Sequence, residues 1–154
     1  MSLASCDGPR QMSDRDPALE PFDALIGTWA TEATHPKFDG VVPGSVTYEW
    51  LEGGRFLVQR SRTEHERFPD SIGVIGAPET GSGLVLEYFD SRGVRRTYGV
   101  SFEDGVLRMW RDHPTFAQRF SATPAQDAFE GLWQLAETPG DFKDDLRVTY
   151  TRRA

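Results

Sequence analysis

The sequence predicts an all-β protein, an up-and-down antiparallel β-barrel of about ten strands with a short N-terminal helix plugging one end. Ten short apolar or alternating segments are separated by turn-forming residues, and the 154 residues include 15 glycines and 10 prolines. Only residues 22–29 show the helical spacing of apolar side chains. Without a second helix, crossover connections for a parallel sheet are missing, so the strands pair antiparallel and close into a barrel.

The chain divides into a tail and one domain. Residues 1–16 are polar, and we expect them to be a disordered tail, with residues 17–154 forming the barrel. Residues 3–6 resemble a lipoprotein cleavage box, but no basic or apolar segment precedes them, so we expect a cytoplasmic protein. Cys6 is the only cysteine, which excludes a disulfide within the chain and a thiolate metal site.

The net charge and the hydropathy of the chain bear on which kinds of molecule it can bind. A net charge of −7 argues against a nucleic acid or an anionic membrane surface, because binding phosphates requires clustered positive charge. No apolar run approaches the roughly 18 residues of a membrane-spanning helix. We therefore expect neither nucleic acid nor membrane as a partner.

The predicted helix lies at the start of the domain. Phe22, Leu25, Ile26 and Trp29 follow the i, i+3, i+4, i+7 spacing of one apolar helix face. Gly27 ends the helix, because glycine readily adopts the positive φ that such an end requires. The residues beyond it alternate with the period of a strand.

The strands follow in a meander. We expect them over residues 30–34, 45–51, 55–63, 71–75, 84–89, 94–102, 106–111, 116–122, 129–136 and 146–152. Successive loops then alternate between the two ends of the barrel. The loops at residues 35–44, 64–69, 91–93, 113–115 and 138–144 fall at the end opposite the helix, which we call the mouth.

The turns between the strands set their register. We expect residues 52–54 to form a three-residue loop that pairs Trp50 with Phe56, whereas a two-residue Gly-Gly loop would pair Trp50 with Leu57. The first alternative separates apolar from polar residues better, and we adopt it. The turns at residues 91–93 and 104–105 give five further pairs, Leu86–Tyr98, Tyr88–Arg96, Phe102–Leu107, Val100–Met109 and Tyr98–Arg111.

This register predicts an inner wall that is apolar and aromatic. Its members are Val46, Tyr48, Trp50, Phe56, Val58, Ile72, Val74, Leu84, Leu86, Tyr88, Tyr98, Val100, Phe102, Leu107 and Met109. Arg60, Arg96 and Arg111 share this face, while no acidic residue of these strands does. His35, His65 and His113 fall in loops at the mouth.

The start of the barrel resembles a known family. Gly27-Thr28-Trp29, placed at the first strand after a short helix, is similar to the Gly-x-Trp signature of lipocalins and their calycin relatives. In lipocalins an arginine near the end of the last strand covers this tryptophan, and Arg152 matches that position. The resemblance extends over residues 22–152. Residues 50–56, Trp-Leu-Glu-Gly-Gly-Arg-Phe, resemble bacterial lipocalin-like barrel proteins of unknown function most closely.

Nitrobindins, which are haem-binding barrels, are also similar, but this sequence departs from them. Their alternating glycines after the tryptophan are replaced here by Thr31, Ala33 and His35. No histidine lies in the last strands to ligate iron. We therefore expect no haem and no other cofactor, with a nitrobindin-like haem protein kept as an alternative.

The predicted function is the binding of a small, mostly apolar ligand that carries an anionic or carbonyl group. An arginine inside a barrel needs an acceptor to offset its desolvation, and such a ligand supplies one. The candidate ligand-binding residues are Tyr48, Trp50, Arg60, Tyr88, Arg96, Tyr98, Met109, Arg111, His113, Phe120 and Trp133. Alternatively, the arginines extend to solvent or pair with neighbouring acids, and the aromatic residues only fill the core.

Two further classes of function stay open. No catalytic motif is found in the sequence, yet tyrosine, arginine and histidine in one pocket could act as general acids on a carbonyl ligand. A metal site built from the three histidines has low specificity, because they come from separate loops, and we expect no metal. Alternatively, Val85, Phe89 and Trp110 on the outer face form an interaction patch, which could also make a homodimer.

Overall fold

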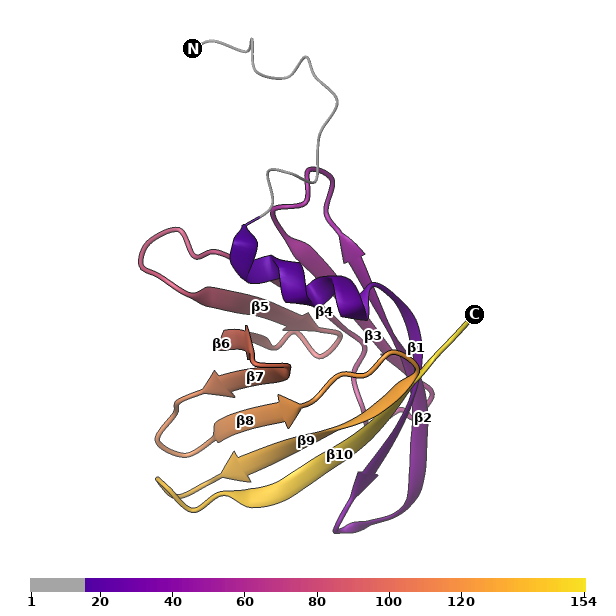
Figure 1. Cartoon of the computed structure of the whole chain (residues 1–154). Helices are drawn as coiled ribbons and strands as arrows, with labels where there is room; N and C mark the ends of the chain where they lie inside the picture. The colour runs from indigo at the N-terminus through magenta and orange to yellow at the C-terminus, as the bar shows by residue number, and fades with distance from the viewer. Residues whose placement is uncertain (1–15) are drawn as a thin grey trace, which may run out of the picture.

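The computed structural model describes residues 16–154, which form a closed antiparallel barrel preceded by one 3-10 helix (Figure 1). The elements are η3 (Pro17–Leu25), β1 (Gly27–His35), β2 (Phe38–Trp50), β3 (Leu57–Thr63), β4 (Ser71–Gly76), β5 (Leu84–Asp90), β6 (Arg95–Glu103), β7 (Val106–Arg111), β8 (Ala117–Ala122), β9 (Ala128–Ala136) and β10 (Lys143–Arg152). Each strand pairs with the next, and β10 closes on β1. The predicted fold class is confirmed.

The remaining expectations for the N-terminal part concern residues outside this range. The predicted tail, apart from Asp16, and the lipoprotein-like box at residues 3–6 lie outside the described residues. Within residues 16–154, no helix is both long and apolar enough to cross a membrane.

The helix η3 fills the interior at one end of the barrel. Asp16 caps it, because its carboxylate accepts a hydrogen bond from the backbone N–H of Ala18 at 2.9 Å. Leu19, Phe22 and Leu25 have no exposed surface, and the Phe22 ring meets Phe102 of β6 edge-on at 5.1 Å. In Figure 1 η3 lies across the barrel between β5 and β1. The expected plug is therefore present.

The predicted contact between the first and last strands is also present. Trp29 of β1 pairs in register with Arg152 of β10, and the guanidinium carbon lies 4.1 Å from the centre of the indole ring. The Trp29 Nε1–H donates to the carbonyl of Leu25 at 2.9 Å, and Arg152 donates to the carbonyls of Ala24 and Ile26. These bonds satisfy carbonyls at the end of η3 that the helix leaves without partners.

The structure corrects the predicted start of the second strand. Residues 38–44, expected within a loop, belong to β2, and only a short turn separates β1 from β2. The glycines and prolines of this stretch suggested a loop. Pro43 is nevertheless tolerated in β2, because the pairing with β3 ends at Gly44 and the missing N–H of Pro43 removes no bond of that ladder. Gly44 is required for space, because a Cβ there would lie 2.4 Å from the backbone oxygen of Arg62.

The structure also corrects the register between β2 and β3. Trp50 pairs with Leu57, because the loop that connects the strands spans residues 51–56 and both Gly53 and Gly54 adopt positive φ. A shift of one residue turns every side chain to the opposite face. Phe56, Val58, Ile72 and Val74 were consequently predicted on the wrong face, and Leu57, Gln59 and Ile75 point inward instead.

The register of β5, β6 and β7 is confirmed. These strands pair as the turns predicted, with Leu86–Tyr98, Tyr88–Arg96, Phe102–Leu107 and Val100–Met109 in register. Asp104 and Gly105 both have positive φ, which gives the tight turn between β6 and β7 its right-handed twist. The wall that holds Tyr88, Arg96 and Tyr98 therefore has the predicted orientation.

Candidate functional site

The half of the barrel away from η3 is open to solvent. Gln59, Tyr88, Arg96, Gln118 and Trp133 come from five different strands, and each remains partly exposed. Their contacts show that they point inward. Gln59 donates to the buried Tyr48 hydroxyl, Arg96 meets Gln118, and the rings of Tyr88 and Trp133 contact Tyr98. Solvent therefore reaches inward-facing side chains at this end, which is the predicted mouth.

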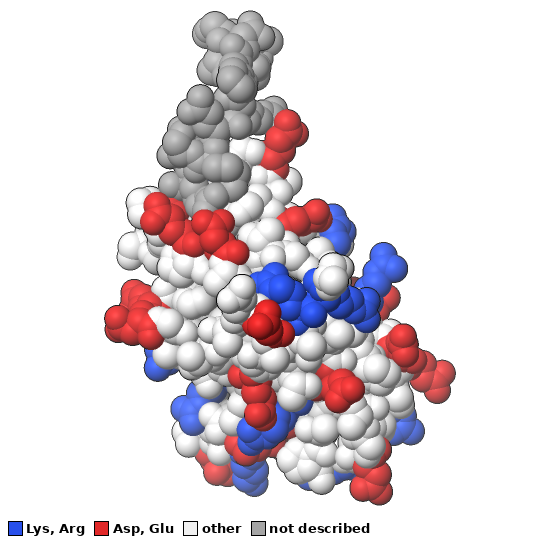
Figure 2. All heavy atoms as spheres, turned by 45° about the vertical axis from the view of Figure 1, so that its right-hand side comes forward, with Lys and Arg blue, Asp and Glu red and all other residues white. Residues whose placement is uncertain are grey.

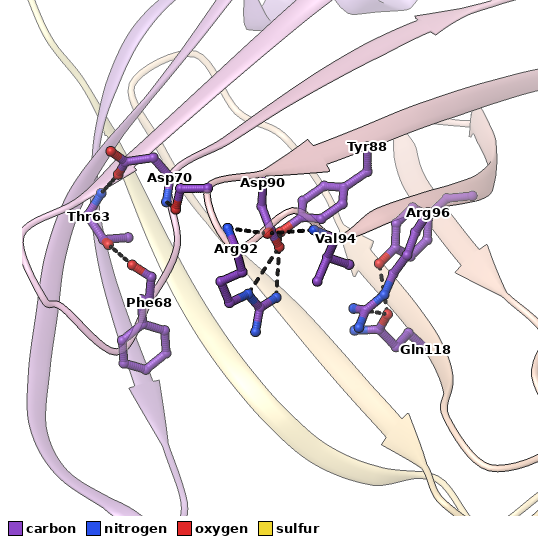
Figure 3. Close-up of polar contacts among 11 residues, drawn as sticks. Thr63, Phe68, Asp70, Tyr88, Asp90, Arg92, Val94, Arg96 and Gln118 are labelled. Carbon is purple, nitrogen blue, oxygen red and sulfur yellow. Dashed lines mark hydrogen bonds and ion pairs between the residues drawn. The ribbon is translucent and has the colours of Figure 1, made fainter.

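One amide oxygen lies at the centre of this site. Gln118 Oε1 accepts a hydrogen bond from the Tyr98 hydroxyl at 2.7 Å and another from Arg96 Nη1 at 3.3 Å. Figure 3 shows the Arg96 and Gln118 side chains directed toward one another. Arg96 also lies over the ring of Phe116, 4.9 Å from its centre. Two proton donors from β6 thus converge on a single neutral acceptor from β8.

A second guanidinium group lies close to this centre. Arg111 donates from Nη1 to the backbone carbonyl of Phe116 at 2.9 Å. Within residues 16–154, neither Arg96 nor Arg111 forms an ion pair with a carboxylate. Their hydrogen-bond acceptors are neutral oxygens, so neither guanidinium group is bonded to a carboxylate of the described residues.

The tyrosines at the mouth are held in the neutral form. Burial raises the pKa of Tyr98, while the charges of Arg96 and Arg111 act in the opposite direction and only reduce the shift. Burial also raises the pKa of Tyr88, and its hydrogen bond to Asp90 adds to that effect. At neutral pH both phenols therefore keep their protons and donate hydrogen bonds, Tyr98 to Gln118 and Tyr88 to Asp90.

A separate ion pair closes the turn between β5 and β6. The Asp90 side chain is fully shielded from solvent and accepts from the Tyr88 hydroxyl at 2.8 Å and from Arg92 Nη2 at 2.7 Å (Figure 3). Burial would raise the pKa of Asp90, but the bonds from Arg92, Tyr88 and the backbone N–H groups of Arg92 and Val94 outweigh it and hold this pKa well below its usual range. This carboxylate is occupied by the turn and fixes Tyr88.

Aromatic rings line the lower part of the mouth. Tyr88 and Tyr98 meet edge-on with centroids 6.1 Å apart, and Tyr98 meets Trp133 at 5.7 Å. Trp133 in turn lies 5.0 Å from Phe120, which is buried beneath it. The site therefore combines an aromatic floor with donors at its side.

The predicted ligand-binding residues separate into groups. Tyr88, Arg96, Tyr98, Arg111 and Trp133 come together at the mouth. Tyr48, Met109 and Phe120 are at most 5% exposed and belong to the core. Trp50 lies at the end of β2 on the η3 side, away from the mouth, and packs against the core.

Two predicted site residues need separate comment. Arg60 was expected inside the barrel, which is wrong, because it lies on the outer face and bonds to Glu49 at 3.2 Å. Its misplacement follows from the register of β3. His113 is exposed in the turn between β7 and β8, where its Nδ1 accepts from the backbone N–H groups of Thr115 and Phe116.

The sequence analysis missed two contributors to the site. Gln118 is the shared acceptor, and Phe116 supports both arginines through its ring and its carbonyl oxygen. Both positions alternate with Phe120, so the period of two along β8 placed them on the same face. Gln118 carries neither a charge nor a ring, so the sequence alone gives no signal that its amide belongs to a site.

The three histidines contact different partners and not one another. His35 Nε2 bonds to Asp145 at 2.8 Å, and His65 packs against Phe38 and Phe68. Among residues 16–154, no three His, Cys, Asp or Glu side chains are grouped so that they could hold a metal ion.

The outer face carries an exposed apolar row. Ile72 of β4 pairs with Phe89 of β5, and these side chains are 40% and 42% exposed. Trp110 is 41% exposed and lies against Gly99, where a Cβ would come within 2.4 Å of the indole. On the face drawn in Figure 2, charged side chains of both signs are present and the acidic ones are widely spread. The predicted exposure of Phe89 and Trp110 is confirmed, and the homodimer stays a prediction.

The fold and the site together define a class of protein, a closed ten-stranded antiparallel β-barrel with a polar mouth. The crystal structure of Rv2717c from M. tuberculosis is similar, with a TM-score of 0.62 and 18% identity over 92% of this chain and 100% of that chain. The crystal structure of fatty-acid-binding protein 1 from Echinococcus granulosus is also similar, with a TM-score of 0.61 and 15% identity over 86% and 99% of the two chains.

No protein-family model and no curated protein matches the chain. At identities of 18% and 15% the two likenesses show the fold alone. The predicted ten-stranded antiparallel barrel is therefore confirmed, and the relation to calycins inferred from residues 27–29 stays a prediction. The closer resemblance to bacterial lipocalin-like proteins stays a prediction.

Proposed function

We propose that this protein binds a small, mostly apolar molecule at the mouth of the barrel, through an anionic or carbonyl group on that molecule. The observation that carries the proposal is the convergence of Arg96 and Tyr98 on one neutral oxygen, beside a second arginine that has no carboxylate partner among residues 16–154. An anionic oxygen in place of the Gln118 amide oxygen would form stronger, charge-assisted bonds to the same donors.

The fold supports this proposal. The similar barrel from Echinococcus granulosus is a fatty-acid-binding protein, so a barrel of this shape can serve a binding function. The aromatic floor formed by Tyr88, Tyr98 and Trp133 provides the apolar surface that a small ligand needs. We also propose the cytoplasm as its compartment, because the chain has a single cysteine and so forms no internal disulfide.

A thermal-shift experiment with matched arginine variants tests the proposal. The probe is 8-anilinonaphthalene-1-sulfonate, an apolar anion, added at a hundredfold excess over its Kd. Binding at that excess stabilises the fold by ~2.7 kcal/mol, which corresponds to a rise in Tm of roughly 5–10 °C for a domain of this size. We expect Arg96→Met to remove most of this rise.

Arg60→Met is the control, because it removes the same charge from the outer face of the barrel. We expect this variant to keep the full thermal shift. Equal shifts in Arg96→Met and Arg60→Met would show that the probe does not use the guanidinium group at the mouth. A native protein that responds neither to this probe nor to fatty acids would contradict the proposed function.

A further inference from the structure

The space available to a ligand is shallow, because η3 fills the opposite half of the barrel. Leu19, Phe22 and Leu25 project from η3 into the core and have no exposed surface. A water-sized void beside these side chains would leave part of their surface exposed. The half of the barrel near η3 is therefore closed to a ligand.

The closed region extends up to the level of Tyr98. Val100, Met109 and Phe120 lie side by side on β6, β7 and β8, and each is at most 5% exposed. From Tyr98 to Arg95, the first residue of β6, the strand advances by three residues, or about 10 Å. An apolar group can be enclosed only over this distance between Tyr98 and Arg95, which is too short for an extended long acyl chain.

The walls of this layer favour a planar ring. Tyr98 is 3% exposed and presents its ring to both Tyr88 and Trp133, at interplanar angles of 87° and 64°. Tyr88 and Trp133 are themselves only partly buried, so part of their surface is free to contact a ligand. Aromatic rings gain from edge-to-face and offset contacts beyond the area that they bury.

The polar group of such a ligand has a defined place. Gln118 Oε1 marks a point that lies 2.7 Å from the Tyr98 hydroxyl and 3.3 Å from Arg96 Nη1. A carboxylate oxygen at this point would take over both bonds, with the Gln118 side chain turned away. Arg111 lies close to this point, because it bonds to the carbonyl of Phe116, the residue whose ring lies against Arg96.

We propose that the ligand is a compact aromatic acid, with its ring among Tyr88, Tyr98 and Trp133 and its carboxylate at Arg96 and Tyr98. Long-chain fatty acids are disfavoured, because the side chains of η3 occupy the space that their tails would need. This inference rests on the proposed function and adds the size and chemical class of the ligand.

Calorimetric titration of the full chain with 2-naphthoate, 2-naphthalenemethanol and palmitate tests the inference. We expect 2-naphthoate to bind at least tenfold more tightly than either the neutral alcohol or palmitate. Trp133→Leu should weaken 2-naphthoate about tenfold and leave palmitate unchanged. Trp110→Leu, on the outer face, is the matched control and should change neither affinity.

Phe22→Ala tests the role of η3, because it opens space in the core at the η3 end, against Phe102. We expect palmitate to bind this variant more tightly and 2-naphthoate to bind it unchanged. If Phe22→Ala does not fold, Phe22→Leu makes the same comparison with a smaller change in volume. If the native protein binds palmitate as tightly as 2-naphthoate, and Arg96→Met weakens the binding of both, this inference is wrong and the proposed function stands. Protein that binds none of the three, and does not bind 8-anilinonaphthalene-1-sulfonate, would overturn both.

Discussion

Arg152 joins three separate parts of the chain, so its substitution tests how the plugged end is held together. Its guanidinium donates to the carbonyls of Ala24 at 2.7 Å, Ile26 at 2.9 Å and Gln126 at 2.7 Å, and it covers the ring of Trp29. Arg152→Met keeps an apolar chain over the indole and removes all three hydrogen bonds. The carbonyls at the end of η3 would then lose their charged partner.

The expected loss follows from these contacts. Each of the three hydrogen bonds to a charged donor contributes roughly 1 kcal/mol at a partly exposed site. The cation–π contact adds about 1 kcal/mol. We therefore expect Arg152→Met to lower the free energy of unfolding by about 3–4 kcal/mol, which corresponds to a fall in Tm of roughly 10 °C.

Urea unfolding, followed by tryptophan fluorescence and by circular dichroism, measures this difference. Arg153→Met is the control, because Arg153 uses its backbone N–H to bond to the Thr28 carbonyl, and the substitution keeps that bond. We expect the control to lie within about 0.5 kcal/mol of the native protein. If the two variants unfold alike, Arg152 does not clamp η3 to the barrel, and the reasoning is refuted.

Four further expectations follow from the described residues. The pKa of Asp90 is held well below its usual value of ~3.9, so the stabilising effect of its carboxylate is present above that pH and is lost as the pH falls. The free energy of unfolding of Asp90→Asn should therefore depend less steeply on pH below about 4 than that of the native protein. Burial raises the pKa values of Tyr48 and Tyr150, so the unfolded chain loses these two protons at a lower pH than the folded protein does. The free energy of unfolding should therefore fall above pH ~10, and it should fall less steeply in Tyr48→Phe. Protein expressed with added haem should show no Soret band after gel filtration; a retained band would contradict this. If the exposed row at Phe89 makes a homodimer, light scattering should detect it and Phe89→Ser should remove it.

The sequence predicted the parts of the fold that are encoded locally. The Asp104-Gly105 turn and the turn at residues 91–93 fix the register on both sides of β6, because their positive φ angles select one loop geometry each. Trp29 and Arg152 lie at opposite ends of the chain, and they were placed together by the topology of an even-stranded meander and by the resemblance to lipocalins.

The register of β3 is not determined by a turn that allows only one geometry. The Gly53-Gly54 pair is compatible with loops of several lengths, and the choice between them rested on separating apolar from polar residues. That criterion failed because the outer face of this barrel carries apolar side chains as well, Ile72 being 40% exposed and Val58 covered on the outside by its neighbours. The patterning of β3 and β4 therefore gives no unique inner face, and only the loop length decides it.

This register determines where the charge of the site lies. With Arg60 on the outer face, the inner wall at β3 presents Gln59, whose amide already donates to the Tyr48 hydroxyl. The arginines of the proposed site consequently come from β6 and β7, where Arg96 and Arg111 both contact Phe116, and the inner wall at β3 is neutral there. In the proposed binding mode an anionic group would be drawn to β6 and β7, and the apolar part of the same molecule would face Trp133 and Tyr88. Such a mouth would set both the position and the orientation of the ligand, which a ring of arginines around the barrel would not do.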